Sequence, residues 1–243
     1  MFDFDNYFGI NRPNLDLDFG PVDTKEIVSF NEYIQETSKL RNLNNKDNQK
    51  ILYRGQKEDW PLIPTIGRDK GSNAYSEVKE KNELKKFIQE SDSNPKYNDL
   101  EWLTLAQHYH VPTRLLDWTE DSFVALWFAC NGKKINNDSS RIVWGFLINL
   151  NELPDINFEK PLELKKMAVF KHNPIDKRMI SQNAWFTVHY FDDDFKWCDA
   201  LENEKQVKKK LFKFKLTISE TLRNEFLKEL DKMGINSFSL FPD

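Results

Sequence analysis

The stretch KILYRGQKEDWPLIP, residues 50–64, decides how the fold is read, because it places a permanent cation at the end of an apolar run. The run Ile51-Leu52-Tyr53 predicts a short buried strand, and Arg54 and Gly55 follow it directly. Arginine stays protonated in proteins, so its burial needs an anion or several carbonyl groups. Glycine lets a ligand or another backbone approach closely. Two interpretations are open at this point: a phosphate site, or an internal ion pair.

The composition predicts a packed globular chain. A length of 243 residues suits one large domain or two small ones, and 39% hydrophobic and 14% aromatic residues supply a core. The net charge of −4 argues against a global surface for polyanions. Cys130 and Cys198 form no metal-binding spacing with each other or with the four histidines, so we expect reduced thiols and no metal.

The sequence also bears on location. The first ten residues, MFDFDNYFGI, lack the basic and apolar regions of a signal peptide. No apolar run reaches the roughly 18 residues that a membrane helix needs. We therefore expect a cytoplasmic protein with no membrane partner.

The hydrophobic pattern predicts a leader arm over residues 1–21 and a single α+β domain over residues 22–243. Predicted helices cover residues 23–40, 74–91, 99–110, 123–130 and 219–234. Predicted strands cover residues 51–54, 141–150, 185–190 and 211–218. Residues 111–122 are expected to form a turn-rich connection. Helices predominate early, so we expect helices of the N-terminal half to pack on a mainly antiparallel β-sheet, which could be split.

Two of these helices carry specific expectations. Asp23 or Thr24 is the expected N-cap of the first helix. The inner face of the second helix is expected to consist of Val78, Leu84, Phe87 and Ile88.

Two further segments carry polar residues where a plain core would not. AQHYHVPTRLLDW, residues 106–118, places Arg114 and Asp117 within one turn, so they could pair with each other. Asp117 could instead hold Arg54. We expect His108 to form hydrogen bonds within the fold before we consider it as a base. DKRMISQNAWFTVHY, residues 176–190, places Arg178 and Gln182 before a strand, as at the lining of a cleft.

Together the three segments resemble the FRG-domain family, which is named for an aromatic-Arg-Gly motif. That motif corresponds to Tyr53-Arg54-Gly55. The second motif corresponds to Gln107-His108-Tyr109 followed by residues 112–119, PTRLLDWT, and the apolar helix behind them. The third corresponds to Arg178-Met179 with Gln182 and Phe186, and the closing Leu240-Phe241-Pro242-Asp243 is also similar. The resemblance spans roughly residues 25–243.

The sequence departs from the family pattern at two turns. The family usually has Gly where His110 stands and a Gln-Gly pair where Asn183-Ala184 stands. The turn after His108 is therefore expected to be reshaped.

The layout of the three segments is similar, more loosely, to that of ADP-ribosyltransferases. This likeness implies an ADP-ribosyltransferase-like fold and an NAD-dependent enzyme, acting as a toxin or phage-defence effector on an unknown protein or nucleic-acid acceptor. Cleavage of the nicotinamide–ribose bond passes through an oxocarbenium-like state, as glycoside cleavage does. Such chemistry needs an anion clamp, a stacking surface and a polar group at the ribose.

We expect the three segments to meet in one cleft that binds NAD. Arg54 would clamp the pyrophosphate, Trp118 or Tyr109 would stack on a ring, and Gln182 would bond a ribose hydroxyl. A late-strand Glu is missing, so Asp117 and Glu101 are the nearest candidates for the carboxylate. The expected catalytic residues are Arg54, Asp117 and Gln182. The expected cofactor-binding residues are Tyr53, Arg54, Gly55, His108, Tyr109, Thr113, Arg114 and Trp118.

A second hypothesis is a non-catalytic module that binds a nucleotide or nucleic acid. Its basis is a set of lysines that interleave with Phe212 and Phe214: Lys205, Lys208, Lys209, Lys210, Lys213 and Lys215. On a strand, lysines and phenylalanines would face opposite sides, so a solvated face over a core face explains the same pattern.

Overall fold

The structure is a computed structural model that describes residues 22–41, 48–68, 77–91, 97–134, 140–154, 160–171, 177–191 and 198–242. The expected leader arm over residues 1–21 lies outside these residues. Within them the chain builds one seven-stranded sheet with the order β1-β7-β4-β2-β3-β6-β5. The pair β1–β7 is parallel and the other pairs are antiparallel, which confirms the predicted α+β class with a mainly antiparallel sheet.

The strands, in chain order, are β1 Asp23–Ile27, β2 Gln49–Gln56, β3 Leu115–Thr119, β4 Arg141–Asn149, β5 Ala168–Phe170, β6 Ala184–Val188 and β7 Leu211–Leu216. The α-helices are α2 Phe30–Arg41, α3 Glu77–Glu90, α4 Asp99–His108, α5 Ser122–Cys130, α6 Lys177–Ser181, α7 Lys205–Lys208, α8 Glu220–Lys232 and α9 Ser237–Leu240. Single 3₁₀ turns are η1 Thr65–Gly67, η3 Leu150–Glu152, η4 Pro161–Glu163 and η5 Leu201–Asn203.

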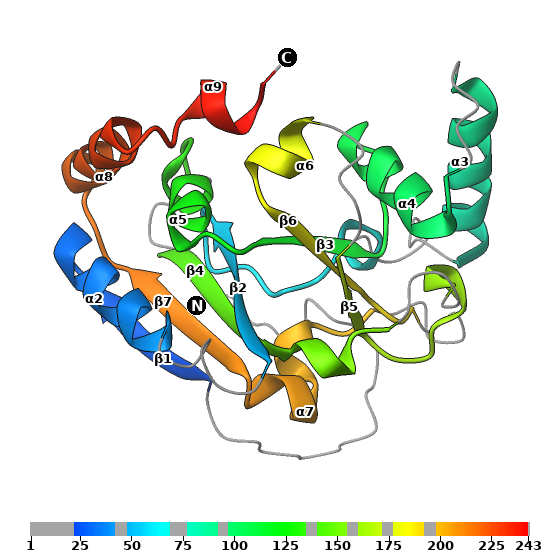
Figure 1. Cartoon of the computed structure of the whole chain (residues 1–243), viewed down its shortest axis with the longest axis horizontal. Coiled ribbons are helices and arrows are strands. Elements are labelled where there is room, and N and C mark those ends of the chain that lie inside the picture. Colours follow the sequence, from blue (N-terminus) through cyan, green and yellow to red (C-terminus); the bar gives the residue numbers. More distant parts are fainter. Residues whose placement is uncertain are drawn as a thin grey trace.

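The helices form two groups at opposite ends of the sheet (Figure 1). Helices α2, α5 and α8 share one hydrophobic core with β1, β2, β4 and β7. Helices α3 and α4 share another with β3, β5 and β6. Helices of the N-terminal half therefore pack on the sheet as expected, and α8, which covers most of the predicted helix 219–234, joins the first group.

Two segments differ from their predicted structure because pairing with distant strands decides them. Residues 23–27 form β1 beside β7, and the helix begins only at Phe30, where the Ser29 hydroxyl accepts from the Glu32 amide at 3.2 Å. The N-cap expected at Asp23 or Thr24 is therefore wrong. Residues 115–119 form β3 beside β6 instead of a turn-rich connection. Apolar and polar residues do not alternate along β3, because the strand is buried on both faces except at Asp117. The pattern that indicates a half-buried strand is therefore missing.

Helix α3 turns a different face inward than its apolar residues predicted. Leu84 is buried as expected, but Val78 is 62% exposed. Glu80 takes an inner position instead and is fully buried. A charged residue can occupy such a position only with a partner, which Arg114 supplies, as described below.

The sheet is continuous but narrow between β2 and β3. These strands are joined by a single paired position, Tyr53 opposite Thr119. Strand β2 pairs with β4 along its whole length, and β3 pairs with β6 along its whole length. The sheet therefore consists of two well-paired halves that meet at this junction and diverge beyond it.

Glu120, which directly follows β3, ties the two halves together. Its carboxylate accepts hydrogen bonds at 2.7 Å from Lys50 on β2, from Lys171 after β5, and from the Trp185 indole on β6. Partial burial raises the pKa of this carboxyl, but the three hydrogen bonds outweigh burial and lower the pKa to about 2. The ionised form of Glu120 is therefore the one that the folded state stabilises.

We predict that Glu120→Gln destabilises the fold by about 1 kcal/mol at pH 7, a value reduced for solvent screening of a half-exposed cluster. A lowered pKa contributes stability above the ordinary value of 4.5 and loses it as pH falls toward about 2. The difference between variant and wild type in urea unfolding should therefore shrink between pH 5 and pH 3. Glu163→Gln, on an exposed ion pair with Lys160, serves as the control and should have little effect.

Helix α5 packs so closely on β2 that only glycine fits at position 55. A Cβ on Gly55 would lie 1.8 Å from the Ala125 carbonyl oxygen and 2.7 Å from the Ala129 nitrogen, both backbone atoms of α5. The glycine beside Arg54 therefore serves the approach of a helix backbone. This contact fixes the height of α5 above the sheet.

We predict that Gly55→Ala costs about 3 kcal/mol or more, because backbone atoms on both sides would have to move apart. Gly145→Ala is the matched control on the neighbouring strand, since a Cβ there meets its nearest atoms at an ordinary 3.6 Å. Urea unfolding of both variants measures the difference. Equal effects at the two positions would contradict the close packing of α5 on β2.

Candidate functional site

A cavity of about 510 Å³ lies where β2 and β3 diverge, and its walls come from β2, β3, β6, α4, α5, α6 and the segment after α9. Its size is typical of small-molecule sites. Three arginines line it: Arg54, Arg68 and Arg178. Among the described residues that line it, Asp117 is the single carboxylate. The cavity therefore carries an excess of positive charge and suits an anionic ligand.

Arg54 reaches from β2 across the junction toward β3. Its Nη1 donates to the Asp117 carbonyl at 2.8 Å and lies 3.7 Å from the Asp117 carboxylate. Its Nε is buried and has no hydrogen-bond partner among the described residues. Arg54 therefore contacts Asp117, as the internal ion pair requires, and also lines the cavity, where a phosphate site stays a prediction. Burial lowers the pKa of Arg54, Asp117 acts in the opposite direction, and Arg68 adds repulsion.

Asp117 is held by a chain of side chains from the second motif. The Thr113 hydroxyl donates to Gln107 Oε1 at 2.5 Å, and Gln107 Nε2 donates to the Asp117 carboxylate. The Asp117 side chain remains 57% exposed and faces the cavity. The poorly solvated base of the site raises the pKa of this carboxyl above its ordinary value, although Arg54 opposes the shift. Thr113 is buried behind Gln107, so it contributes by orientation.

Arg68 is a site residue that sequence reasoning missed. It follows η1, and the hydrogen bond that its side chain makes within the described part of the chain runs from Nε to the Ile63 carbonyl at 3.0 Å. Burial lowers the pKa of Arg68, while nearby Asp117 raises it. Arg54 and Arg68 therefore share one carboxylate. The only sequence signal was an arginine after a Pro-rich turn, which does not specify where the side chain points.

The third motif supplies a further part of the cavity wall, with Arg178 and Gln182 in the lining. Arg178 Nη1 lies 3.2 Å from His108 Nε2, and the guanidinium carbon lies 4.5 Å from the centre of the Phe241 ring. Since a guanidinium only donates, His108 accepts this bond. Gln182 lines the cavity, and its Nε2 donates to the Leu240 carbonyl at 2.9 Å. The third motif thus holds the C-terminal segment against the cavity.

Not all expected site residues meet the cavity. Trp118 lines it, but its indole is buried and donates to Thr187 at 3.0 Å. Tyr109 is 63% exposed and lies outside the lining. Glu101 completes the capping box at the start of α4 with Asn98 and is also outside the lining. Asp117 is therefore the better of the two candidate carboxylates.

Arg114 belongs to the frame around the site. It is fully buried, and its Nε and Nη2 donate to Glu80 on α3 at 2.8 and 2.7 Å. Its backbone amide donates to the other Glu80 oxygen at 2.9 Å. The pairing expected between Arg114 and Asp117 is therefore wrong. The partner lies on a helix 34 residues away, and this ion pair fixes α3 against the start of β3.

We predict that Glu80→Gln destabilises the protein by about 3–5 kcal/mol, because it leaves the buried Arg114 charge uncompensated. Glu77→Gln, at 3.8 Å from the same guanidinium but partly exposed, should cost less than about 1 kcal/mol. Chemical unfolding of both variants checks this. A small effect at Glu80 would show that Arg114 finds another anion or water.

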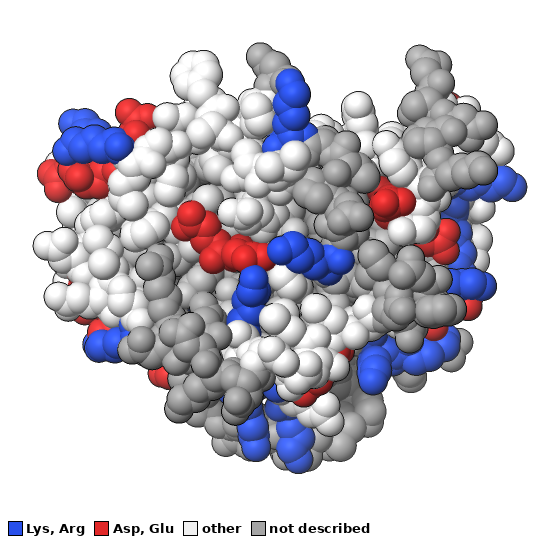
Figure 2. All heavy atoms as spheres, viewed as in Figure 1, with Lys and Arg blue, Asp and Glu red and all other residues white. Residues whose placement is uncertain are grey.

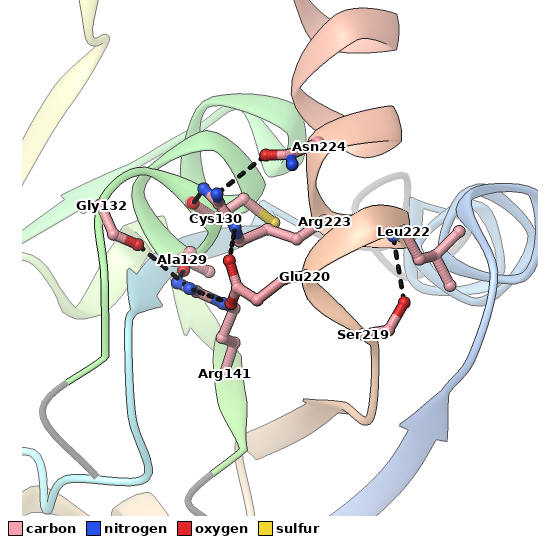
Figure 3. A network of polar contacts seen from close by, with 9 residues as sticks. All are labelled: Ala129, Cys130, Gly132, Arg141, Ser219, Glu220, Leu222, Arg223 and Asn224. Atoms are coloured by element: carbon pink, nitrogen blue, oxygen red, sulfur yellow. Dashed lines mark hydrogen bonds and ion pairs between the residues drawn. The ribbon is translucent and has the colours of Figure 1, made fainter. Parts of the chain in front are cut away.

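The α5 wall of the cavity is fixed at its C-terminal end by two arginines (Figure 3). Arg141 Nη1 donates to the Ala129 carbonyl at 2.8 Å, and Arg223 Nη1 donates to the Cys130 carbonyl at 3.0 Å. Glu220 accepts from both arginines, at 3.2 and 2.6 Å. The last carbonyls of a helix lack partners within it, so these bonds complete the helix and join α5 to β4 and α8.

The turns that depart from the family pattern keep the backbone that glycine favours. His110, where the pattern has Gly, adopts a φ of 64°, and it lines the cavity. Asn183 adopts a φ of 47°. His and Asn are among the residues that tolerate this region. A left-handed turn therefore remains after His108, with an imidazole added to the site.

The lysines of the second hypothesis are partly neutralised. Lys213 lies 2.6 Å from Asp59, and Lys210 and Lys215 form ion pairs with acidic side chains at 3.2 and 3.1 Å. On the face in Figure 2, basic side chains are scattered among acidic ones and form no continuous surface. These contacts give the lysines a role in solvated ion pairs.

The described part of the chain forms neither a metal-binding cluster nor a membrane-spanning helix. No group of three or more His, Cys, Asp or Glu residues there could hold a metal ion. No helix formed by those residues is long and apolar enough to cross a membrane.

Comparison with known families agrees with the first two motifs. Residues 49–138 match the FRG domain. This range contains β2, α3, α4, β3 and α5, whereas the third motif and the closing segment lie outside it. No curated protein and no solved structure gives a significant match to the chain. The likeness to ADP-ribosyltransferases therefore stays a prediction.

Proposed function

We propose that the cavity binds NAD as the substrate of an ADP-ribosyltransferase-like enzyme. Residues 49–138, which match the FRG domain, supply much of its lining, and residues 178–186 and Phe241 supply the rest. The observation that carries the proposal is the charge of the lining: three arginines meet one carboxylate in a single cavity. A pyrophosphate supplies the missing negative charge, and a carboxylate is the group that cleavage of a nucleoside bond requires.

The pyrophosphate would lie at Arg54 and Arg68. The described residues do not saturate either guanidinium: among them Arg54 Nε has no partner, and the Arg68 side chain donates from Nε alone. Guanidinium groups bind phosphate oxygens through paired hydrogen bonds, and the bonds are stronger at a buried site. The two positive charges would then be balanced by the ligand instead of by Asp117 alone.

Asp117 would act at the nicotinamide ribose. The bond between ribose C1′ and the nicotinamide nitrogen breaks, and its electron pair leaves with nicotinamide. A carboxylate stabilises the positive charge that develops on the ribose. The acceptor oxygen or nitrogen then forms a bond to C1′ and loses a proton to Asp117 or to solvent. With water as acceptor, the products are ADP-ribose, nicotinamide and a proton.

Either outcome would harm a cell, by modification of a macromolecule or by loss of NAD. This is the basis for proposing a toxin or phage-defence effector, with a protein or nucleic acid as acceptor. Arrested growth on expression, relieved by Asp117→Asn, is the behaviour that such a role requires.

The test is release of nicotinamide from NAD by the purified protein, with and without cell lysate as a source of acceptor. We predict that Asp117→Asn lowers kcat about 10²- to 10⁴-fold, the usual contribution of a catalytic carboxylate. Because the pKa of Asp117 is raised, the wild-type rate should fall on the acid side at a pH above the ordinary aspartate value of 3.8. Chemical unfolding of Asp117→Asn at pH 7 checks that the variant folds, since the substitution removes the carboxylate that lies 3.7 Å from Arg54.

Asp59→Asn is the matched control, since Asp59 pairs with Lys213 and lies outside the cavity lining. Its activity should equal that of wild type. Binding of NAD without any nicotinamide release, and with no change on Asp117→Asn in cells, would replace the enzyme by a non-catalytic nucleotide-binding module.

A further inference from the structure

We propose, resting on the function above, that the cavity accepts NAD in one orientation: adenine against Phe241 and Phe128 beside Arg178, pyrophosphate at Arg54 and Arg68, and nicotinamide ribose at Asp117. The proposal follows from the charged side chains that lie beside the aromatic rings and beside the pyrophosphate site: Arg178 at Phe241, and Asp117 at Arg54.

The aromatic end is built from two helices and the C-terminal segment. The Phe241 and Phe128 rings are 6.0 Å apart at an interplanar angle of 77°, and Trp127 lies behind both. Both phenylalanines line the cavity. Such faces hold flat bases by stacking, which typically contributes about 1–3 kcal/mol for each base. This end therefore suits one of the two rings of NAD.

Charge decides which ring lies there. The nicotinamide ring of NAD carries a positive charge, whereas adenine is neutral and offers ring nitrogens as acceptors. Arg178 lies 4.5 Å from the Phe241 ring, so it would repel a pyridinium at this end and can donate to adenine. Asp117 contacts Arg54 and Gln107 and is the single carboxylate in the described lining. The cationic ring and the cationic transition state are therefore both favoured at Asp117.

The position of the pyrophosphate is consistent with this direction. Arg54 contacts Asp117 directly, and Arg68 lies close enough to both residues to interact with their charges. In NAD the pyrophosphate joins the two riboses, so a ribose lies directly beside it whichever way the molecule runs, and the charges of Arg178 and Asp117 decide the direction. The same adjacency exists in the cavity between the two arginines and Asp117.

The base-binding end joins residues inside and outside the match to the FRG domain: Phe128 lies within residues 49–138, whereas Arg178 and Phe241 lie beyond them. The Leu240 carbonyl accepts from Ser181 at 3.2 Å and from Gln182 at 2.9 Å, and these bonds hold Phe241 in the wall. The C-terminal segment thereby becomes the part of the chain that selects the base.

The experiment compares two variants and three probes by calorimetry. ADP reports on the adenine site, nicotinamide mononucleotide on the site at Asp117, and inorganic pyrophosphate on the arginines alone.

We expect Phe241→Leu to weaken ADP binding about fivefold or more, and to change the affinities for pyrophosphate and nicotinamide mononucleotide less than about twofold. Asp117→Asn should give the reverse pattern, with weaker binding of nicotinamide mononucleotide and unchanged or tighter binding of ADP. Phe238→Leu is the control, because Phe238 is 87% exposed on the same short helix.

Retained pyrophosphate affinity shows that Phe241→Leu still folds. The proposal is overturned if Phe241→Leu weakens nicotinamide mononucleotide instead of ADP, if it weakens neither, or if wild type binds neither nucleotide. Nicotinamide release from NAD, measured on the same preparations, separates the two proposals. If nicotinamide is released but the two variants do not weaken ADP and nicotinamide mononucleotide respectively, the proposed enzyme stands and the proposed orientation is wrong. If the two variants show these selective losses but no nicotinamide is released, the binding orientation is supported and the enzymatic function is wrong.

Discussion

The contact between Gly55 and the backbone of α5 is the constraint on which the site depends. With a Cβ at this position only 1.8 Å from the Ala125 carbonyl oxygen, the helix could not lie where it does. Ala125 and Phe128 of the same helix line the cavity, and Arg54 is the residue next to the glycine. One close approach therefore sets both the wall of the cavity and the position of its first guanidinium. The arginines that complete the other end of α5 keep the helix from shifting along this contact.

The cavity exists because two halves of a sheet meet at one point. If β2 and β3 paired along their length, backbone hydrogen bonds would fill the space that Arg54 now crosses. The cost is a junction with little backbone pairing, and Glu120 offsets it with three charge-assisted or indole hydrogen bonds. Stability at the junction thus comes from side chains and leaves room for a ligand.

Arg54 and Arg114, one from each of the first two motifs, have different roles because they have different partners. Arg114 is saturated by Glu80 and is buried with it, so it has no capacity for a ligand. Arg54 shares Asp117 with Arg68 and keeps an unpaired Nε. The residue type is the same in both cases. What differs is the number of hydrogen bonds to a carboxylate that the fold gives each guanidinium. Of the two, Arg54 has fewer and is the one that lines the cavity.

The sequence by itself determined the strand that carries Arg54, the apolar helix α5, and the residues of the three motifs, because apolar runs and periodicity are local properties. Only the tertiary structure decided that residues 23–27 and 115–119 are strands, since their partners lie on distant segments. It also decided which anion each arginine meets. Arg68 joined the site without a sequence signal, because the direction of a side chain after a turn is set by packing and not by local pattern.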